Sequence, residues 1–259
     1  MKYPILTYHK VSEQWELSFT MMYPAQFEKQ MRYLADKGYK GKNLKEYLRD
    51  PKKKDFVITF DDAYESVYHF AFPVLNELGF RASVFVPTKY IGEMNTWDFT
   101  PGNIHARHMN EEQLRDLHMS GWEIASHGED HRAMTGLPVK TAVHEMSHSK
   151  VILESLINEN IETFCFPFGV YNKRLIRAAR DAGYRNLVGF TGHSRHDVIT
   201  RSVVYRVVDN PKSVLRKIRV DNPCHFTENM KEAVFHSFAL MTRLKQKLPF
   251  CSVSSRLKK

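Results

Sequence analysis

At 259 residues, the chain is long enough to bury a substantial core, and its length fits one large domain at least as well as two smaller ones. Its composition, 42% hydrophobic and 26% charged with few glycines and prolines, is that of a soluble globular protein and argues against disordered and fibrous classes. The net charge of +9 fits a solvated basic surface or an anionic partner such as nucleic acid, membrane or a phosphorylated substrate. Because basic residues are spread along the chain without a nucleic-acid-binding signature, we expect no nucleic-acid partner.

The N-terminus and the cysteines indicate the cellular compartment of the protein. Residues 1–9 lack the apolar core and small-residue cleavage site of a signal peptide, and no run approaches the roughly 20 apolar residues of a membrane span. Cys165, Cys224 and Cys251 are odd in number and lack metal-type spacing, so they predict neither a disulfide framework nor a zinc knuckle. Both observations favour a cytoplasmic protein.

In chain order, short β-prone runs alternate with amphipathic helical stretches. Strands are expected at residues 5–8, 56–60, 82–86, 123–126 and 163–166. Helical periodicity covers residues 27–34, 67–78 and 138–157. Four helical stretches end in glycine followed by an aromatic residue, which is typical of a left-handed helix stop. These pairs are Gly38-Tyr39, Gly79-Phe80, Gly121-Trp122 and Gly183-Tyr184.

This alternation predicts parallel βα units in an α/β fold, and a barrel accommodates so many units better than a small open sheet. We assign residues 1–222 to a single barrel domain and residues 223–259 to a C-terminal amphipathic helix with a basic tail. In such folds the functional groups lie at the C-terminal ends of the strands.

Polar residues do follow the predicted strands at these ends. His9 follows the first strand, and Asp61 and Asp62 follow the second. Two adjacent carboxylates are costly unless a cation or a shared proton relieves them, although a helix cap would account for one of them. Neighbouring strand residues diverge, so one aspartate can bind a metal while the other accepts a proton.

Histidines follow the fourth predicted strand. His127 and His131 are four residues apart, and with a carboxylate they make a zinc-type facial ligand set; the alternative is a pair of exposed loop histidines. His144 and His148 have the same spacing inside a long predicted helix, and we interpret them as surface residues. After the fifth strand, the turn at Phe168 is either an ordinary turn or a rigid donor of a backbone N–H to an oxyanion.

Together these segments resemble a known family. The segments are Thr59-Phe60-Asp61-Asp62, His127-x-x-x-His131 and Phe166-Pro167-Phe168-Gly169, with Pro4-Ile5-Leu6-Thr7-Tyr8-His9 at the start. In this order they look like the first three motifs of the polysaccharide deacetylase superfamily (NodB-like, carbohydrate esterase family 4), over roughly residues 1–219. The resemblance implies a distorted parallel β/α barrel that hydrolyses N-acyl or O-acyl groups on sugars, usually with zinc.

The resemblance also implies roles for individual residues. Asp61 would be the catalytic base, and the metal ligands would be Asp62, His127 and His131. The backbone N–H of Phe168 would contribute to the oxyanion site. The expected cofactor is therefore a divalent metal ion, Zn²⁺ by analogy with the family.

Three family elements are not evident. Phe164 stands where the third motif often has an arginine, and the fourth motif (aspartate, then Asp-Trp) and the fifth (leucine, then histidine) are absent from the matching regions. These elements normally tune the base and supply the general acid. We assign the acid role to His9, with a structural histidine as the alternative; His193, His196 and His225 are poorer candidates.

The expected reaction is removal of an N-acyl group, acetyl by analogy, from an amino sugar. A cytoplasmic enzyme would meet a nucleotide- or lipid-linked glycan precursor of cell-envelope polysaccharide biosynthesis. An apolar stripe over residues 230–248 and seven Lys/Arg against two Glu from Glu228 to Lys259 suggest peripheral contact with anionic lipid on the inner membrane face. The alternative is a helix packed on the barrel.

Two other functions remain open from the sequence. One is a deformylase or another hydrolase of non-peptide C–N bonds. The other is a carbohydrate-binding barrel that has lost catalysis, which the missing motifs favour and the intact Asp-Asp and histidine pairs oppose. The sequence leaves the oligomeric state undefined.

Overall fold

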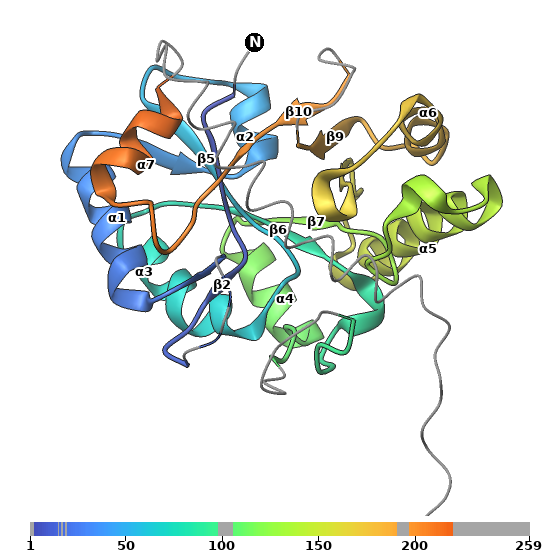
Figure 1. Ribbon diagram of the computed structural model, residues 1–259, viewed down its shortest axis with the longest axis horizontal. Helices are drawn as coiled ribbons and strands as arrows, with labels where there is room; N and C mark the ends of the chain where they lie inside the picture. The colour runs from blue at the N-terminus through green and yellow to red at the C-terminus, as the bar shows by residue number, and fades with distance from the viewer. Residues whose placement is uncertain are drawn as a thin grey trace, which may run out of the picture.

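The computed structural model describes residues 3–14, 16, 18, 20–97, 106–190 and 197–219. Its centre is a parallel sheet in the order β10-β9-β8-β7-β6-β5-β1-β11, with β4 (Lys40–Lys42) paired to β5 outside this path (Figure 1). The inner strands of the path are β1 (Ile5–Tyr8), β5 (Asp55–Phe60), β6 (Ser83–Val86), β7 (Glu123–Ser126), β8 (Thr163–Cys165) and β9 (Asn186–Gly189). Two short strands, β2 (Lys10–Val11) and β3 (Met21–Met22), form a separate parallel pair.

The two ends of the strand path meet in one short segment. β10 (Ile199–Thr200) pairs with β9, whereas β11 (Ser202–Val203) pairs with β1 at the other end of the path. A single residue, Arg201, separates these two strands. The segment from 199 to 203 therefore nearly closes the sheet, which confirms the prediction of a distorted parallel β/α barrel.

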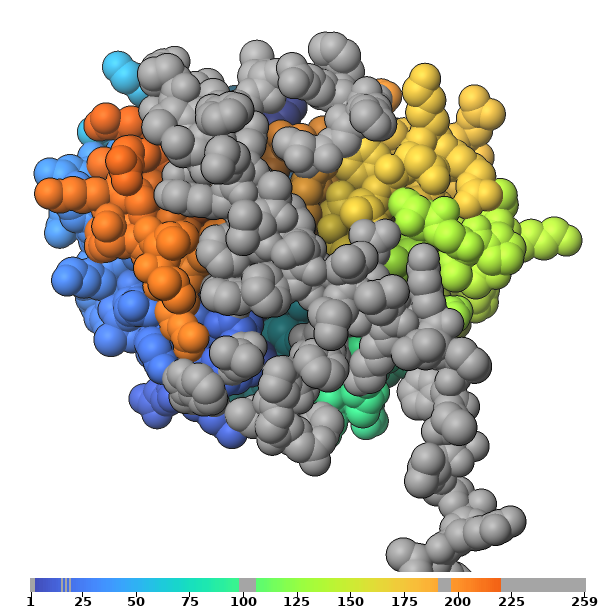
Figure 2. All heavy atoms as spheres, viewed as in Figure 1, coloured from blue at the N-terminus to red at the C-terminus, as the bar shows by residue number. Residues whose placement is uncertain are grey.

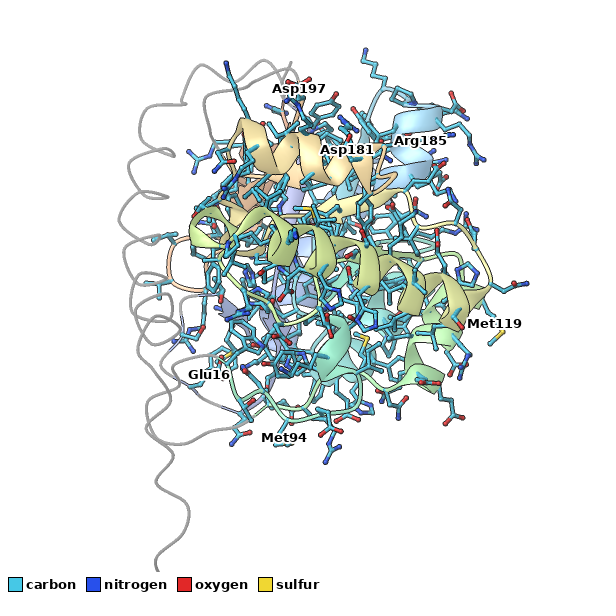
Figure 3. The ribbon with its side chains drawn as sticks, turned by 90° about the vertical axis from the view of Figure 1, so that its right-hand side faces the viewer. Glu16, Met94, Met119, Asp181, Arg185 and Asp197 are labelled. Atoms are coloured by element: carbon cyan, nitrogen blue, oxygen red, sulfur yellow. The ribbon has the colours of Figure 1, made fainter. Side chains whose placement is uncertain are left out.

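Helices cover the outside of this barrel. On one flank, α1 (Pro24–Asp36) packs against α7 (Pro211–Ile218) and α3 (Phe72–Glu77); on the other, α5 (Val139–Ile157) packs against α4 (Glu111–Met119) and α6 (Lys173–Asp181) (Figure 1). The space-filling view shows the same two flanks, coloured blue with orange and green with yellow (Figure 2). α2 (Leu44–Arg49) packs against β5. α5 runs the width of its flank beside α6 (Figure 3).

Alternation along the strands divides the core into two layers. Leu6, Ile58 and Phe164 face the helices, where they join the large outer core. Their neighbours Ile5 and Val57 face the barrel interior. This interior layer is small and also contains Phe85, Ala125, Cys165 and Val188. The barrel is therefore a packed core rather than a pore.

The five predicted strands are confirmed to within one residue at either end. All four glycine stops are also confirmed, with positive φ angles at Gly38, Gly79, Gly121 and Gly183. The predicted helix 67–78 divides into a π-helical turn, Val67–Ala71, followed by α3. Pro73, in the first turn of α3, has no N–H to continue regular α-helical bonding from the preceding turn.

Candidate active site

Four strands deliver the predicted site residues to one end of the barrel. Tyr8 pairs in register with Phe60, Phe60 with Val84, and Val86 with Ser126, so the strand ends lie side by side. The residues that follow them are His9 after β1, Asp61 and Asp62 after β5, and His127 after β7. Phe168 lies in the turn after β8. The structure thus brings the predicted residues to the carboxyl ends of the strands, as expected for this fold.

Asp62, His127 and His131 form a buried cluster. The Nε2 atoms of His131 and His127 lie 3.1 and 3.6 Å from Oδ1 of Asp62, and each residue is at most 3% exposed. One ligand atom from each side chain fits within a 4.8 Å separation. Burial alone would raise the pKa of Asp62, but the charge and hydrogen bond of His131 outweigh it and lower the pKa.

The protonation of His127 suits a metal ion. Nδ1 of His127 lies 2.8 Å from the backbone carbonyl oxygen of Cys165, so we place the proton there and leave Nε2 as the free electron-pair donor. Burial, and next the charge of His131, lower the pKa of His127 to about 4, so the ring is neutral. One carboxylate oxygen and two imidazole nitrogens converging on one point are a donor set that fits Zn²⁺ or a similar divalent ion.

A second combination, Asp61 with His127 and Cys165, also brings three donors together. It suits a metal less well. Burial raises the pKa of the Cys165 thiol well above its usual range, so the thiolate ligand is disfavoured. Both oxygens of Asp61 are already hydrogen-bonded to an arginine. The Asp62 set is therefore the better metal site.

The arginine that holds Asp61 is Arg201, from the segment that closes the barrel. Its Nη1 and Nη2 donate to Oδ1 and Oδ2 of Asp61 at 2.5 and 2.7 Å, and its side chain is 0% exposed. Its guanidinium also lies over the rings of Phe85 and Phe190, at 5.2 and 4.9 Å. Burial would raise the pKa of Asp61, but the charge of Arg201, and then that of His9, lower it. Asp61 is therefore held ionised and fixed in orientation.

Arg201 corrects one expectation from the sequence. The family's arginine is not evident at Phe164, yet the guanidinium of Arg201, between β10 and β11, reaches the base. Phe164 itself faces the outer core, where its ring packs 5.0 Å from that of Tyr184. No local pattern marks Arg201, because it lies 140 residues from Asp61 in sequence and meets it only through barrel closure.

Aromatic side chains line the cluster. The ring of Trp97 lies 3.8 Å from that of His131 and 6.3 Å from that of Phe168. The Phe168 ring lies 4.8 Å from that of His131. Trp97 comes from the loop after β6, so a tryptophan lies beside the cluster although the family's fourth motif is not evident. His9 completes this edge, with Nε2 3.7 Å from Oδ2 of Asp61 and a side chain 22% exposed.

Unusual backbone conformations gather at the same place. Asp62, Ala63, His131 and Phe168 all have positive φ angles between 50° and 68°. His108 supports the backbone conformation of Asp62, because its Nδ1 lies 2.6 Å from the carbonyl oxygen of that residue. Such conformations cost of order 1–3 kcal/mol each and persist where the surrounding structure determines them, as at functional sites.

Gly169, beside Phe168, offers a test of this strained turn. Its φ is +65°, and a Cβ there would lie 1.9 Å from Cδ2 of Phe190. We expect Gly169→Ala to lower the free energy of unfolding by about 2–4 kcal/mol in a urea titration. Gly136→Ala is the matched control, because no atom lies within 4 Å of its added Cβ, and it should change stability by less than about 1 kcal/mol. Equal stability of the two variants would contradict the strain.

The remaining sequence candidates lie elsewhere. His144 and His148 are exposed on α5, as predicted. His193, His196 and His225 lie outside the described residues, as does the predicted helix and tail of 223–259, so the domain boundary at 222 stays a prediction. Within the described ranges, no helix combines the length and apolarity that a membrane crossing requires.

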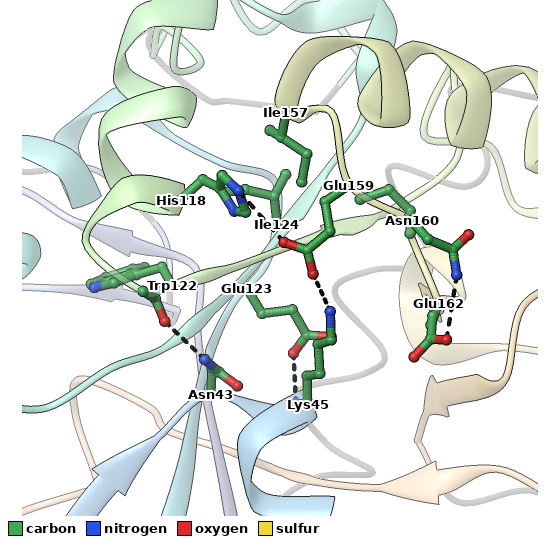
Figure 4. Close-up of a pocket in the computed structure, with 12 residues that line it drawn as sticks. Asn43, Lys45, His118, Trp122, Glu123, Ile124, Ile157, Glu159, Asn160 and Glu162 are labelled. Atoms are coloured by element: carbon green, nitrogen blue, oxygen red, sulfur yellow. Dashed lines mark hydrogen bonds and ion pairs between the residues drawn. The ribbon is translucent and has the colours of Figure 1, made fainter. Parts of the chain in front are cut away.

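The opposite end of the barrel contains a pocket of about 210 Å³, whose polar lining residues are paired with one another (Figure 4). There Glu159 lies between Lys45 and His118. Glu123, at the start of β7, accepts hydrogen bonds from the hydroxyls of Ser83 and Thr163, each at 2.6 Å. These contacts tie neighbouring strands together, so this end serves stability while the Asp-His cluster occupies the functional end.

Comparisons with known proteins identify the family and the fold of this chain. A family model described as polysaccharide deacetylase matches residues 48–187. YxkH of Bacillus subtilis, named as a member of the polysaccharide deacetylases, is 32% identical over 190 residues, covering 71% of this chain and 63% of its own length. Poly-beta-1,6-N-acetyl-D-glucosamine N-deacetylase of Staphylococcus aureus is 26% identical over 175 residues, covering 62% and 58%. The chain thus spans about three fifths of the length of these curated relatives.

Solved structures share the fold. The Streptococcus pyogenes deacetylase PplD, solved with acetate, superposes with a TM-score of 0.73 at 21% identity, covering 85% of this chain and 99% of its own. IcaB from Ammonifex degensii superposes with a TM-score of 0.68 at 20% identity, covering 83% and 94%. With a family model that matches more than half of its length and a barrel of the NodB type, the chain belongs to the polysaccharide deacetylase family.

Proposed function

We propose that this protein is a metal-dependent hydrolase that removes an N-acyl group, acetyl in the simplest case, from an amino sugar. The observation that carries the proposal is the division of labour between the adjacent aspartates. Asp62 faces the Nε2 atoms of His131 and His127, whereas Asp61 is held by Arg201 and faces His9. A metal-binding carboxylate beside an oriented, ionised base is what hydrolysis of an unreactive amide requires.

Asp62, His127 and His131 would hold the metal ion. When bound, the ion polarises the acyl carbonyl and lowers the pKa of a coordinated water. Asp61 accepts the proton of the attacking water, and Arg201 keeps its carboxylate ionised and in place. The backbone N–H of Phe168 would donate to the developing oxyanion.

His9 is the proposed general acid. Its Nε2 lies close to Asp61, and its partial exposure leaves it open to a substrate at the barrel mouth. As the C–N bond breaks, His9 donates a proton to the departing nitrogen, so the products are a carboxylic acid and a free amino sugar. Trp97 and Phe168 supply apolar surface beside the metal ligands, which suits a small acyl group.

For the substrate, the name of the Staphylococcus aureus relative favours N-acetylglucosamine units. Such a unit could belong to a polymer or to a nucleotide- or lipid-linked precursor, and the second form goes with the expected cytoplasmic location. A deformylase would use the same residues. A non-catalytic binding barrel is disfavoured, because Arg201 and Asp61 keep an oriented base that binding alone does not need.

Metal content tests the ligand assignment. We expect about one zinc-like ion per chain at the buried cluster, lost in both Asp62→Ala and His127→Ala because each removes a ligand. Asp61→Asn should retain the ion, because Asp61 bonds Arg201 instead. Elemental analysis after dialysis measures this, with circular dichroism to verify folding. Retention of the cluster's ion in both Asp62→Ala and His127→Ala would disprove the assignment.

A further inference from the structure

A second group of potential metal ligands lies on the outer surface beside the active-site loop. It consists of Glu129, His144 and His148, and their ligand atoms lie within 4.8 Å of one another. Oε2 of Glu129 lies 3.4 Å from Nε2 of His144 and 3.1 Å from Nδ1 of His148. The histidine side chains are 67% and 46% exposed, and that of Glu129 is 23% exposed. This surface triad is separate from the buried cluster and plays no part in the proposed reaction.

The backbone on both sides of the triad is held in place. The N–H of Glu129 donates to Oε2 of Glu145 at 3.0 Å, and its carbonyl oxygen accepts the N–H of Lys89 at 3.1 Å. The two histidines are four residues apart on α5, which places them on one face of the helix. A ligand at this point therefore needs only side-chain adjustment.

Two of the three donor separations are close to those around a coordinated ion. Zinc–nitrogen and zinc–oxygen bonds of about 2.0–2.2 Å in a tetrahedron place neighbouring donor atoms roughly 3.3–3.5 Å apart. The two distances from Glu129 lie at or just below this range. The imidazole rings of His144 and His148 are stacked, 5.1 Å apart and 13° from parallel, so their nitrogen donors lie side by side next to Glu129.

We propose that Glu129, His144 and His148 bind a second divalent transition-metal ion, with Zn²⁺ as its representative, and that this ion fastens the loop of residues 127–131 to α5. The loop carries His127 and His131 of the buried cluster, so occupancy of the surface triad restrains the segment that presents them. Open coordination positions at an exposed three-ligand site are filled by water. The proposal does not depend on the proposed deacylase activity.

The test is a calorimetric titration of chelator-stripped protein with Zn²⁺ at constant neutral pH, with melting temperature as a second readout. The wild type should bind two equivalents. His148→Ala and His144→Ala should each bind one, Asp62→Ala should bind one, and Asp62→Ala combined with His148→Ala should bind none. The second equivalent should raise the melting temperature of the wild type and leave that of His148→Ala unchanged. His69→Ala is the matched control. His69 is also an exposed helical histidine close to a glutamate, 3.8 Å from Glu65, but this pair includes one histidine where the surface triad has two.

The numbers of ions bound by these variants distinguish failure of this inference from failure of the proposed function. If the buried cluster bound no metal, the wild type would bind one ion that His148→Ala loses, and the surface site would stand while the deacylase proposal failed. If His148→Ala and His144→Ala both bound as much Zn²⁺ as the wild type and His69→Ala, the triad would be an ion-pair cluster only and the inference would be overturned. Because both histidines are exposed, these variants are expected to fold normally.

Discussion

Arg201→Met is expected to lower both stability and turnover. Removing the guanidinium leaves the buried Asp61 carboxylate without its two hydrogen bonds, and breaking a buried pair in this way typically costs about 3–5 kcal/mol of unfolding free energy. Turnover should fall at least about 100-fold, since misorientation of a catalytic group by a small distance has an effect of this size. Urea denaturation and initial rates of acetate release measure the two losses.

The pH dependence gives this variant a distinctive signature. In the wild type the pKa of Asp61 is lowered, so its stabilising contribution is present above the ordinary carboxyl pKa of about 3.9 and is lost as the pH falls through the folded value. Without Arg201, burial dominates and raises the pKa. The acidic limb of the activity profile should therefore move to higher pH.

Two comparisons make the Arg201 result specific. Adding Asp61→Asn to Arg201→Met should restore part of the lost stability, because no buried charge is then left unpaired. Arg32→Met removes a guanidinium that also bonds both oxygens of a carboxylate, that of Glu77, but on the exposed surface, and it should leave activity and the pH profile unchanged. A pH profile for Arg201→Met identical to that of the wild type would show that Arg201 does not tune Asp61.

Asp61→Asn is expected to have the largest effect on the reaction. The amide keeps the size of the side chain but cannot accept the proton of water, so turnover should fall about 100- to 10,000-fold while metal content stays at the wild-type level. Acetate release from N-acetylglucosamine oligomers measures the rate, and elemental analysis measures the metal. Wild-type turnover by a fully loaded Asp61→Asn protein would remove Asp61 from the mechanism.

Local patterns predicted much of the scaffold and of the buried cluster. The inner strands have continuous β-prone runs, and each helix end is marked by a two-residue signal, a glycine followed by an aromatic residue. The Asp61-Asp62 and His127-His131 pairs were found because each lies within a few residues of a strand end. Features of this kind can be predicted from the sequence because each depends only on residues that are close together along the chain.

What escaped prediction depends on contacts between distant segments. Arg201 reaches Asp61 only because β10 and β11, two residues each, close the barrel, and strands that short carry no periodic signal. Trp97 and His108 come from connections between elements, where no pattern indicates which surface a ring will meet. The partnership of Glu129 with the α5 histidines likewise arises from the packing of a loop on a helix.

The most direct test of the central claim is acetate release from N-acetylglucosamine oligomers by the Zn²⁺-loaded protein, compared with the same preparation stripped by a chelator. We predict steady release by the loaded protein, loss of release after stripping, and recovery when Zn²⁺ is restored. Absence of release by a fully loaded, folded protein from polymeric, nucleotide-linked and lipid-linked N-acetyl and N-formyl amino sugars would contradict the hydrolase account and leave a carbohydrate-binding barrel.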